Sequence, residues 1–287
     1  MTKVDRVLST NSKINKLYEN KFPILITIGF FLMMSYLAFF HNIIWGGYDT
    51  DGIHYLNFGK AILEGNGTDV KVLNGQIGGP ILFAFLESIT PDTFATVKTI
   101  AILSGSGIVL LSFFITKNIF NYRIAILTQL FIAFNPMLHY ISIQALNELL
   151  PIFIIFVSLY VVTKKELGFF DYTIIGISLG LASLFRLQAI FVLFPILIFI
   201  LLRNKKTIKN TLNLLTILIF FSLVFSPQIL YNLSTHGSIL DSGINYYIGN
   251  LYVFQNPDWH SQVLSQAHTT SLYSIITLDF NLFLENY

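Results

Sequence analysis

Residues 22–44 contain no Asp, Glu, Lys or Arg, and this uncharged stretch constrains the fold more than any other feature. A helix needs about 20 apolar residues to cross the hydrocarbon core of a bilayer. The stretch is too long for a signal-peptide core, and no small-residue cleavage pattern follows it, so we expect a retained anchor. Charged residues make up 11% of the chain, against about 25% in a soluble domain. The sequence therefore predicts an all-α polytopic membrane protein.

Six further apolar segments follow, separated by charged residues, Gly, Asn or Pro. Together with 22–44 they predict about seven transmembrane helices, the others at about 97–116, 118–135, 138–162, 169–186, 188–202 and 211–231. Segment 79–90 is apolar but too short to cross, so we interpret it as a re-entrant or interfacial helix. These boundaries give a transmembrane module, 1–231, with an outer loop at 46–96, and an extracytoplasmic C-terminal segment, 232–287.

Basic residues set the predicted orientation. With a cytoplasmic N-terminus, the 17 Lys and Arg residues all fall in inner segments except for Lys60, Lys71, Lys98 and Arg186. This is the positive-inside pattern of integral membrane proteins. Most of the 15 acidic residues and all six histidines fall on the outer side, so we expect the chemistry to be extracytoplasmic. No basic aromatic patch suggests a nucleic-acid partner.

The outer loop begins with two carboxylates, Asp49 and Asp51. After them, His54, Lys60 and Glu64 recur at helical spacing among apolar residues, which predicts an amphipathic helix on the outer leaflet. A single Asp in this position is most simply a helix N-cap. Two carboxylates at i and i+2 can also bind a divalent cation such as Mg²⁺ or Mn²⁺, or accept a proton from an attacking hydroxyl. Both interpretations stay open.

Two later charges are further candidates. Glu148 interrupts the otherwise uncharged run 124–163, where an ionised group needs a polar cavity or partner unless it reaches the outer interface. Arg186 lies at the outer turn between the fifth and sixth predicted spans. Its side chain can bind two phosphate oxygens at once, or it can extend into the headgroup region. The histidines show no metal-ligand spacing such as HxxxH.

The order of these features resembles the GT-C glycosyltransferases, particularly the protein O-mannosyltransferase and aminoarabinose transferase branch. The resemblance rests on the segments DGIHYLNFGKA (51–61), NGQIGGPILFAF (74–85), SIQALNELL (142–150), GISLGLASLFRLQAI (176–190) and YYIGN (246–250). Members of this family move a sugar from a polyprenyl-phosphate or dolichyl-phosphate carrier to a protein or lipid acceptor on the outer side. An essential Asp in their first loop is followed four residues later by Tyr, here Asp51 and Tyr55.

The resemblance implies an inverting transfer within the membrane, surrounded by lipids, with Asp51 as general base and Asp49 and Glu148 as supporting carboxylates. It implies that the donor and its departing phosphate are bound by Arg186, His54, Tyr55, Lys60 and Gln76. If a cation takes part, Asp49 and Asp51 are its expected ligands.

Two features depart from the family. Asp49 precedes Asp51 and Gly52 follows it, which is closer to the DxD motif of oligosaccharyltransferases and leaves metal dependence open. The chain also ends soon after the seventh predicted span, so we expect a minimal module, a truncated enzyme or a partner subunit. Two other classes stay open. One is a lipid or solute transporter, which needs ionisable residues near mid-membrane, and the other is a non-catalytic membrane scaffold.

Overall fold

The computed structural model describes residues 3–41, 50–64, 76–144, 148–203, 207–236 and 239. Within these residues every regular element is helical, which confirms the predicted all-α class. The helices are α1 (Lys3–Phe39), α2 (Thr50–Leu63), α3 (Gly78–Ile89), α4 (Thr93–Ile119), α5 (Tyr122–Ala133), α6 (Pro136–Ser142), α7 (Leu149–Val162), α8 (Phe169–Phe185), the 3-10 helix η1 (Leu187–Ala189), α9 (Ile190–Arg203) and α10 (Thr207–His236).

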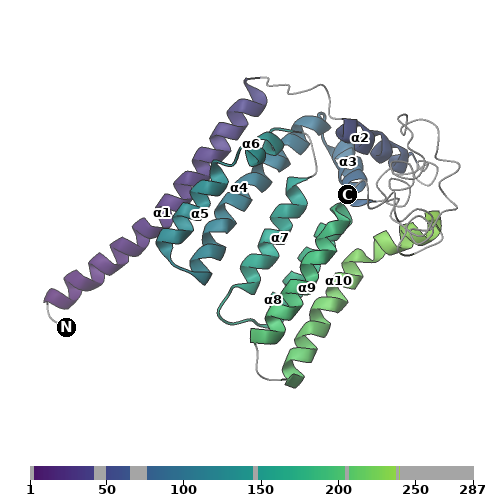
Figure 1. Cartoon of the computed structure of the whole chain (residues 1–287). Helices are drawn as coiled ribbons and strands as arrows, with labels where there is room; N and C mark the ends of the chain where they lie inside the picture. The colour runs from purple at the N-terminus through teal and green to yellow at the C-terminus, as the bar shows by residue number, and fades with distance from the viewer. Residues whose placement is uncertain are drawn as a thin grey trace, which may run out of the picture.

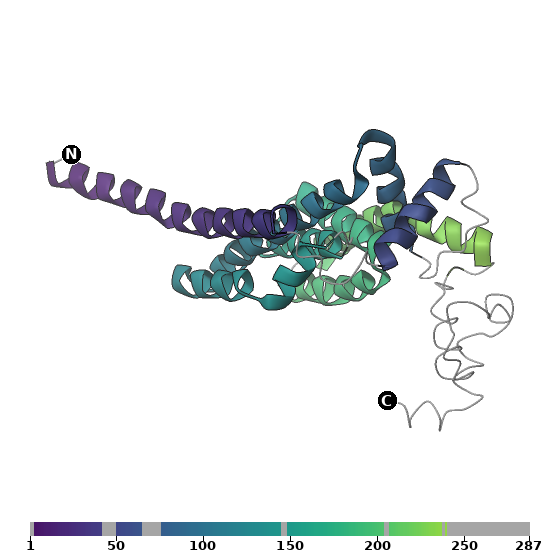
Figure 2. The same cartoon turned by 90° about the horizontal axis from the view of Figure 1, so that it is seen from above.

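The long helices lie side by side and alternate in direction (Figure 1). α4 packs against α1, α5 and α7, and α8 packs against α7 and α10. Seen from above, the N-terminal half of α1 projects away from the other helices (Figure 2). Helices α2 and α3 and the break between α8 and α9 lie at one end of the bundle (Figure 1), which we call the α2–α3 end. We call the opposite end the basic end, after Lys117, Arg123, Lys164, Lys165 and Arg203.

Three helical segments are long and apolar enough to cross a bilayer: Lys21–Phe39, Thr93–Ile119 and Thr211–Ser234. A fourth candidate is the pair α5 and α6, which is bent by 56° at its junction. The apolar helices at Leu149–Val162, Phe169–Phe185 and Leu187–Arg203 are shorter. By length and composition, the described residues thus hold three candidate spans, or four if the bent pair is one span, and the count of seven stays a prediction.

The boundary predicted between the third and fourth spans falls at the junction of α5 and α6, but the predicted fourth span is wrong. α6 begins at Pro136 as the continuation of the bent pair, and α7 begins only at Leu149, so the predicted span 138–162 is not one helix. The junction has a local cause. The side chain of Asn135 accepts hydrogen bonds from two backbone N–H groups of the next turn, at 2.9 and 3.1 Å, and Pro136 follows it. This Asn-Pro start ends α5 and caps a new helix.

Both helices predicted in the outer loop are present. α2 begins at Thr50, and α3 covers all but the last residue of the segment predicted at 79–90. The two helices touch closely, because a Cβ atom on Gly59 would lie 2.7 Å from the backbone nitrogen of Ala84. Of the predicted C-terminal segment 232–287, the described residues include only 232–236, which continue α10, and 239. The segment YYIGN lies outside the described residues.

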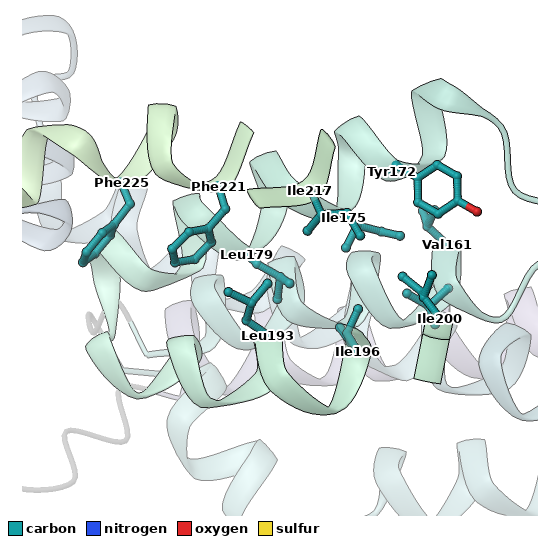
Figure 3. Close-up of a cluster of buried hydrophobic side chains, with 11 residues drawn as sticks. Val161, Tyr172, Ile175, Leu179, Leu193, Ile196, Ile200, Ile217, Phe221 and Phe225 are labelled. Atoms are coloured by element: carbon teal, nitrogen blue, oxygen red, sulfur yellow. The ribbon is translucent and has the colours of Figure 1, made fainter. Parts of the chain in front are cut away.

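A cluster of buried apolar side chains joins α7, α8, α9 and α10 (Figure 3). Phe221 and Phe225 of α10 stack with their ring centroids 5.6 Å apart. On α9, one buried face follows the helical period; its residues are Leu193, Ile196 and Ile200. The cluster fixes α8 between its neighbours, and α8 in turn presents Arg186 at the α2–α3 end.

α8 and α10 approach each other at backbone distance because two residues of α8 lack a side chain. Gly176 and Gly180 are four residues apart and so share one face of α8. A Cβ atom on Gly176 would lie 2.5 Å from the carbonyl oxygen of Ile217, and one on Gly180 would lie 2.8 Å from that of Phe221. Small residues at this spacing commonly allow close helix packing inside membranes.

Replacement of Gly176 by alanine should lower the stability of the bundle. The new methyl group meets backbone that cannot rotate away, so α10 has to shift along its contact with α8, at a cost of about 1–3 kcal/mol. Gly29→Ala is the matched control, since a Cβ on this helical glycine meets nothing within 4 Å. In thermal unfolding of the detergent-solubilised protein, we expect a clear drop in Tm for Gly176→Ala and none for Gly29→Ala. Equal melting temperatures would contradict the close α8–α10 contact.

Candidate functional site

Glu148 and Arg186 form an ion pair at the α2–α3 end. Glu148 occupies the N-cap position of α7, and Arg186 directly follows the last residue of α8. α7 and α8 are antiparallel neighbours, which brings these ends together although they are 38 residues apart in the chain. Each charge also complements the dipole of its own helix, the acid at an N-terminus and the base at a C-terminus. The structure thus pairs two residues that the sequence predicts as separate candidates.

The pair is half-buried, with 31% of each side chain exposed. Arg186 contributes its Nη2 atom to the contact with Glu148. Within the described part of the chain, the other N–H groups of the guanidinium make no hydrogen bond. A guanidinium that is oriented by a carboxylate and keeps further donors can bind the oxygens of a phosphate group. The geometry therefore suits an anion-binding site at this end of the bundle.

Gln76 is buried directly beside Arg186. Its amide faces the backbone on both sides of the arginine: the nitrogen donates to the Phe185 carbonyl (2.6 Å) and the oxygen accepts from the Leu187 N–H (3.3 Å). This orientation of the amide follows from its neighbours, because a carbonyl can only accept and an N–H can only donate. The predicted contact of Gln76 with substrate stays a prediction.

Tyr55 and Lys60 connect α2 to α3. Tyr55 is buried, and its ring lies 5.9 Å from that of Phe83, centroid to centroid. Lys60 forms an ion pair with Glu87, with 3.4 Å between Nζ and Oε1. Both predicted donor-binding residues therefore hold the two helices together, and their contact with a donor stays a prediction.

Glu87 also connects α3 to the start of α4. The hydroxyl of Thr93 donates to the second carboxylate oxygen of Glu87 at 2.5 Å. This hydrogen bond is the main cause that lowers the pKa of Glu87 below its ordinary value, and the charge of Lys60 acts in the same direction, while burial opposes both. Glu87 is therefore charged at neutral pH, where it holds α2, α3 and α4 together.

The predicted acidic motif lies largely outside the described residues. Asp51 and His54 belong to the first half of α2, but their side chains are not described, and Asp49 precedes the helix and is not described at all. Within the described residues, no group of three or more His, Asp or Glu side chains is placed to hold a metal ion. Asp49 and the side chain of Asp51 are not among those residues, so a cation at this pair stays a prediction.

Sequence reasoning missed Gln228, a fully buried amide in α10 whose oxygen accepts from the Ile77 N–H at 3.1 Å. It also missed Glu87 and Thr93 as a link between helices. A signal for Gln228 did exist, because a polar residue within an apolar span needs a partner. The partner itself, 151 residues away in the chain, could not be found without the fold.

The apolar helices are typical of an integral membrane protein. The partly exposed Arg186–Glu148 pair gives this protein a polar site at one end of its helix bundle. Residues 77–231 match the model of a family described as dolichyl-phosphate-mannose-protein mannosyltransferase. Since this match spans more than half of the sequence, the chain belongs to that family of membrane glycosyltransferases, as its resemblance to GT-C enzymes implies. The matched residues contain Glu148 and Arg186, whereas α2 precedes them.

No curated protein and no solved structure is similar enough to the chain to count as a match.

The charged carboxylate of Glu87, through Thr93 and Lys60, should make a small contribution to stability that depends on pH. Because the pKa of Glu87 in the folded state is lowered from 4.5, the contribution is present above that value and is lost as the pH falls through the lowered pKa. The side chains of Lys60 and Glu87 are partly solvated, so we expect less than about 1 kcal/mol. The Tm difference between wild type and Glu87→Gln should be measurable at pH 7 and shrink as the pH falls below 4.5 and through the lowered pKa of Glu87.

Glu64→Gln is the control for this experiment, because Glu64 is an exposed carboxylate that follows α2. Its Tm should equal that of the wild type across the same pH range. A Glu87→Gln difference that stays constant as the pH is lowered from 7 until the protein unfolds would show that the charge of Glu87 is not its source.

Proposed function

We propose that this chain transfers a sugar from a dolichyl-phosphate or other polyprenyl-phosphate donor to a protein or lipid acceptor at the α2–α3 end. The observation that carries the proposal is the Arg186–Glu148 pair, which lies within the family-matched residues and at the same end of the bundle as α2. An arginine in this position suits a phosphate whose negative charge grows as its bond to the sugar breaks.

In the proposed reaction, Asp51 accepts a proton from the acceptor hydroxyl or amine as that group attacks the anomeric carbon. The bond between this carbon and the phosphate oxygen breaks with inversion, and its electron pair leaves with the polyprenyl phosphate. Arg186 stabilises the departing phosphate, and Glu148 keeps the guanidinium oriented. α2, which carries Asp51, is fixed to α3 through Gly59 and Lys60. The further candidates for contacts to the substrates are Asp49, His54 and Tyr55.

A divalent cation between Asp49 and Asp51 is part of the same proposal. A DxD pair offers hard oxygen ligands of the kind that Mg²⁺ and Mn²⁺ prefer. Transfer that is lost on treatment with EDTA and restored by either metal supports this role. Transfer that continues in EDTA removes the cation from the proposal.

We further propose that α1, α4, the α5–α6 pair, α7, α8, α9 and α10 each cross the membrane. They alternate in direction (Figure 1), and the shorter helices expose large apolar side chains, among them Phe170, Phe191 and Ile198, which suits contact with lipid tails. Basic residues at the helix ends and in the α7–α8 connection gather at the basic end. By the positive-inside rule this end is cytoplasmic, together with the N-terminus, and the site is extracytoplasmic.

Cysteine labelling tests this topology directly, since the chain contains no cysteine. Ser88→Cys places a thiol at an exposed position of α3, and Glu166→Cys places one in the exposed α7–α8 connection at the basic end. In intact cells, a membrane-impermeant maleimide should label Ser88→Cys and leave Glu166→Cys unlabelled until the membrane is opened. The reverse pattern would place the site in the cytoplasm and overturn the proposed orientation.

Replacement of Asp51 by asparagine should abolish transfer, because the amide cannot accept the proton; a general base contributes about 10²–10⁴ in rate. The purified protein is given a panel of polyprenyl-phosphate sugars, dolichyl-phosphate mannose included, with peptide or lipid acceptors, and the release of polyprenyl phosphate is measured. Activity of Asp51→Asn within tenfold of wild type would exclude Asp51 as the base.

Asp92→Asn is the matched control at the same end of the bundle. The Asp92 side chain caps α4 by accepting from the Ala95 N–H at 2.9 Å, and asparagine caps helices about equally well. Its activity and stability should equal those of wild type. A wild-type protein that turns over no donor in the panel would favour the non-catalytic scaffold.

A further inference from the structure

Arg186 occupies a break between two helices. Its backbone is extended (φ −143°, ψ 108°), so α8 ends at Phe185 and η1 begins at Leu187. A continued helix would bring the N–H of Ala189 to the carbonyl of Phe185. Here that N–H donates to the carbonyl of Arg186 instead, at 2.9 Å. The break therefore leaves backbone groups on both sides of Arg186 that need other partners.

The amide of Gln76 supplies both of these partners. It donates to the carbonyl of Phe185 and accepts from the N–H of Leu187, at 2.6 and 3.3 Å. One buried side chain thus satisfies the residue before and the residue after the arginine. A buried N–H or carbonyl that lacks a partner is costly, so these contacts favour the broken conformation over a continuous helix.

A second buried amide holds the segment that carries Gln76. Gln228 accepts a hydrogen bond from the N–H of Ile77, the next residue, at 3.1 Å. Its own nitrogen donates to Asn232 (2.8 Å), whose nitrogen donates to the carbonyl of Ile239 (3.0 Å). Gln228 and Asn232 are 1% and 3% exposed, so this chain of amides lies inside the protein.

A proline directly precedes Gln228 in α10. Pro227 has no N–H, so it cannot bond to the carbonyl of Leu223 one turn earlier. The hydroxyl of Ser226 donates to that carbonyl instead, at 2.8 Å. α10 thus accommodates an interrupted turn next to Gln228 without leaving the freed carbonyl unbonded.

The start of α3 lies directly on the end of α8. A Cβ atom on Gly78 would be 2.6 Å from the carbonyl oxygen of Leu184 and 2.8 Å from the nitrogen of Phe185. Glycine is therefore required for the backbone of α3 to reach this position. Contact at this distance leaves the two chains little freedom to slide past each other.

We propose that Gln76 and Gln228 are positioning residues that form a clamp between α3, α8 and α10 and thereby aim Arg186 at the donor phosphate. Neither amide acts on the substrate in this role; both act through the arginine. α3 also holds α2, so the clamp connects the helix that carries Asp51 to the break that carries Arg186. This inference rests on the proposed function. It adds the residues that fix the position of Arg186, which binds the leaving phosphate, relative to Asp51, the proposed base.

A double-mutant cycle on transfer activity tests the clamp. Gln76→Ala should lower kcat/KM for the polyprenyl-phosphate donor by about tenfold or more, because Arg186 is no longer held. In the Arg186→Gln background, the same change should have no further effect on kcat/KM. Residues that act through one another are non-additive in this way, whereas a general loss of structure would multiply the two effects.

Gln129→Ala is the matched control. Gln129 is also a fully buried glutamine that bonds to a neighbouring helix, donating to the carbonyl of Pro23 in α1 at 2.9 Å. It lies in α5, outside the clamp. Its loss should lower Tm by a similar amount and leave kcat/KM for the donor within about twofold of wild type.

If Gln76→Ala does not fold, Gln228→Leu takes its place in the cycle. Leucine has a volume similar to that of glutamine but cannot accept the hydrogen bond from the Ile77 N–H. A wild-type enzyme that is active but shows multiplicative effects for both clamp variants would overturn the clamp and leave the proposed function standing. A wild-type protein that turns over no donor would overturn the proposed function, and the role of the clamp in it. Non-additive effects on kcat/KM in the double-mutant cycle, together with an unchanged kcat/KM for Gln129→Ala, support both the clamp and the proposed function.

Discussion

Backbone contact with α8 is the interaction on which the rest of the structure depends. Gly176 and Gly180 let α10 reach one face of this helix, and Gly78 lets the start of α3 rest against its end. In lipid there is no hydrophobic force that pushes apolar helices together, so close van der Waals contact has to hold them. Because α8 is held along its length and at its end, the residue that follows it, Arg186, has a defined place.

Among the described residues, the side chains that support the helix break at Arg186 are neutral amides. The side-chain amides form hydrogen bonds with the backbone and with each other; they belong to Gln76, Gln228 and Asn232. The charged side chains of Glu148 and Arg186, in contrast, stay partly exposed. This division agrees with the cost of burial, since an unpaired charge is far more expensive to bury than an amide that is hydrogen-bonded. Neutral side chains can therefore support a charged residue from within the protein, where a second ion pair would be costly.

Much of this arrangement could be predicted from local patterns. Uncharged runs and their periodicity identify the helices, and Glu148 and Arg186 stand out because charges in apolar runs are rare. The junction at Asn135 and Pro136 is marked in the sequence and is predicted as a boundary, whereas the end of α6 at Ser142 is missed because apolar residues continue from α6 into α7. The clamp could not be predicted, since the backbone groups that Gln76 and Gln228 bind are exposed only by the fold. The carboxylates of Asp49 and Asp51 remain known from sequence alone.

The short helices have a consequence for the surrounding lipid. α7 and α9 have 14 residues each and α8 has 17, which at 1.5 Å per residue is about 21 to 26 Å. α4, with 27 residues, reaches about 40 Å. If all of them cross the bilayer, whose apolar core is about 30 Å thick, the hydrophobic mismatch is concentrated at α7, α8 and α9. The bilayer then has to thin where these helices meet lipid, which brings lipid headgroups closer to the mid-plane near the end of α8, where Arg186 follows.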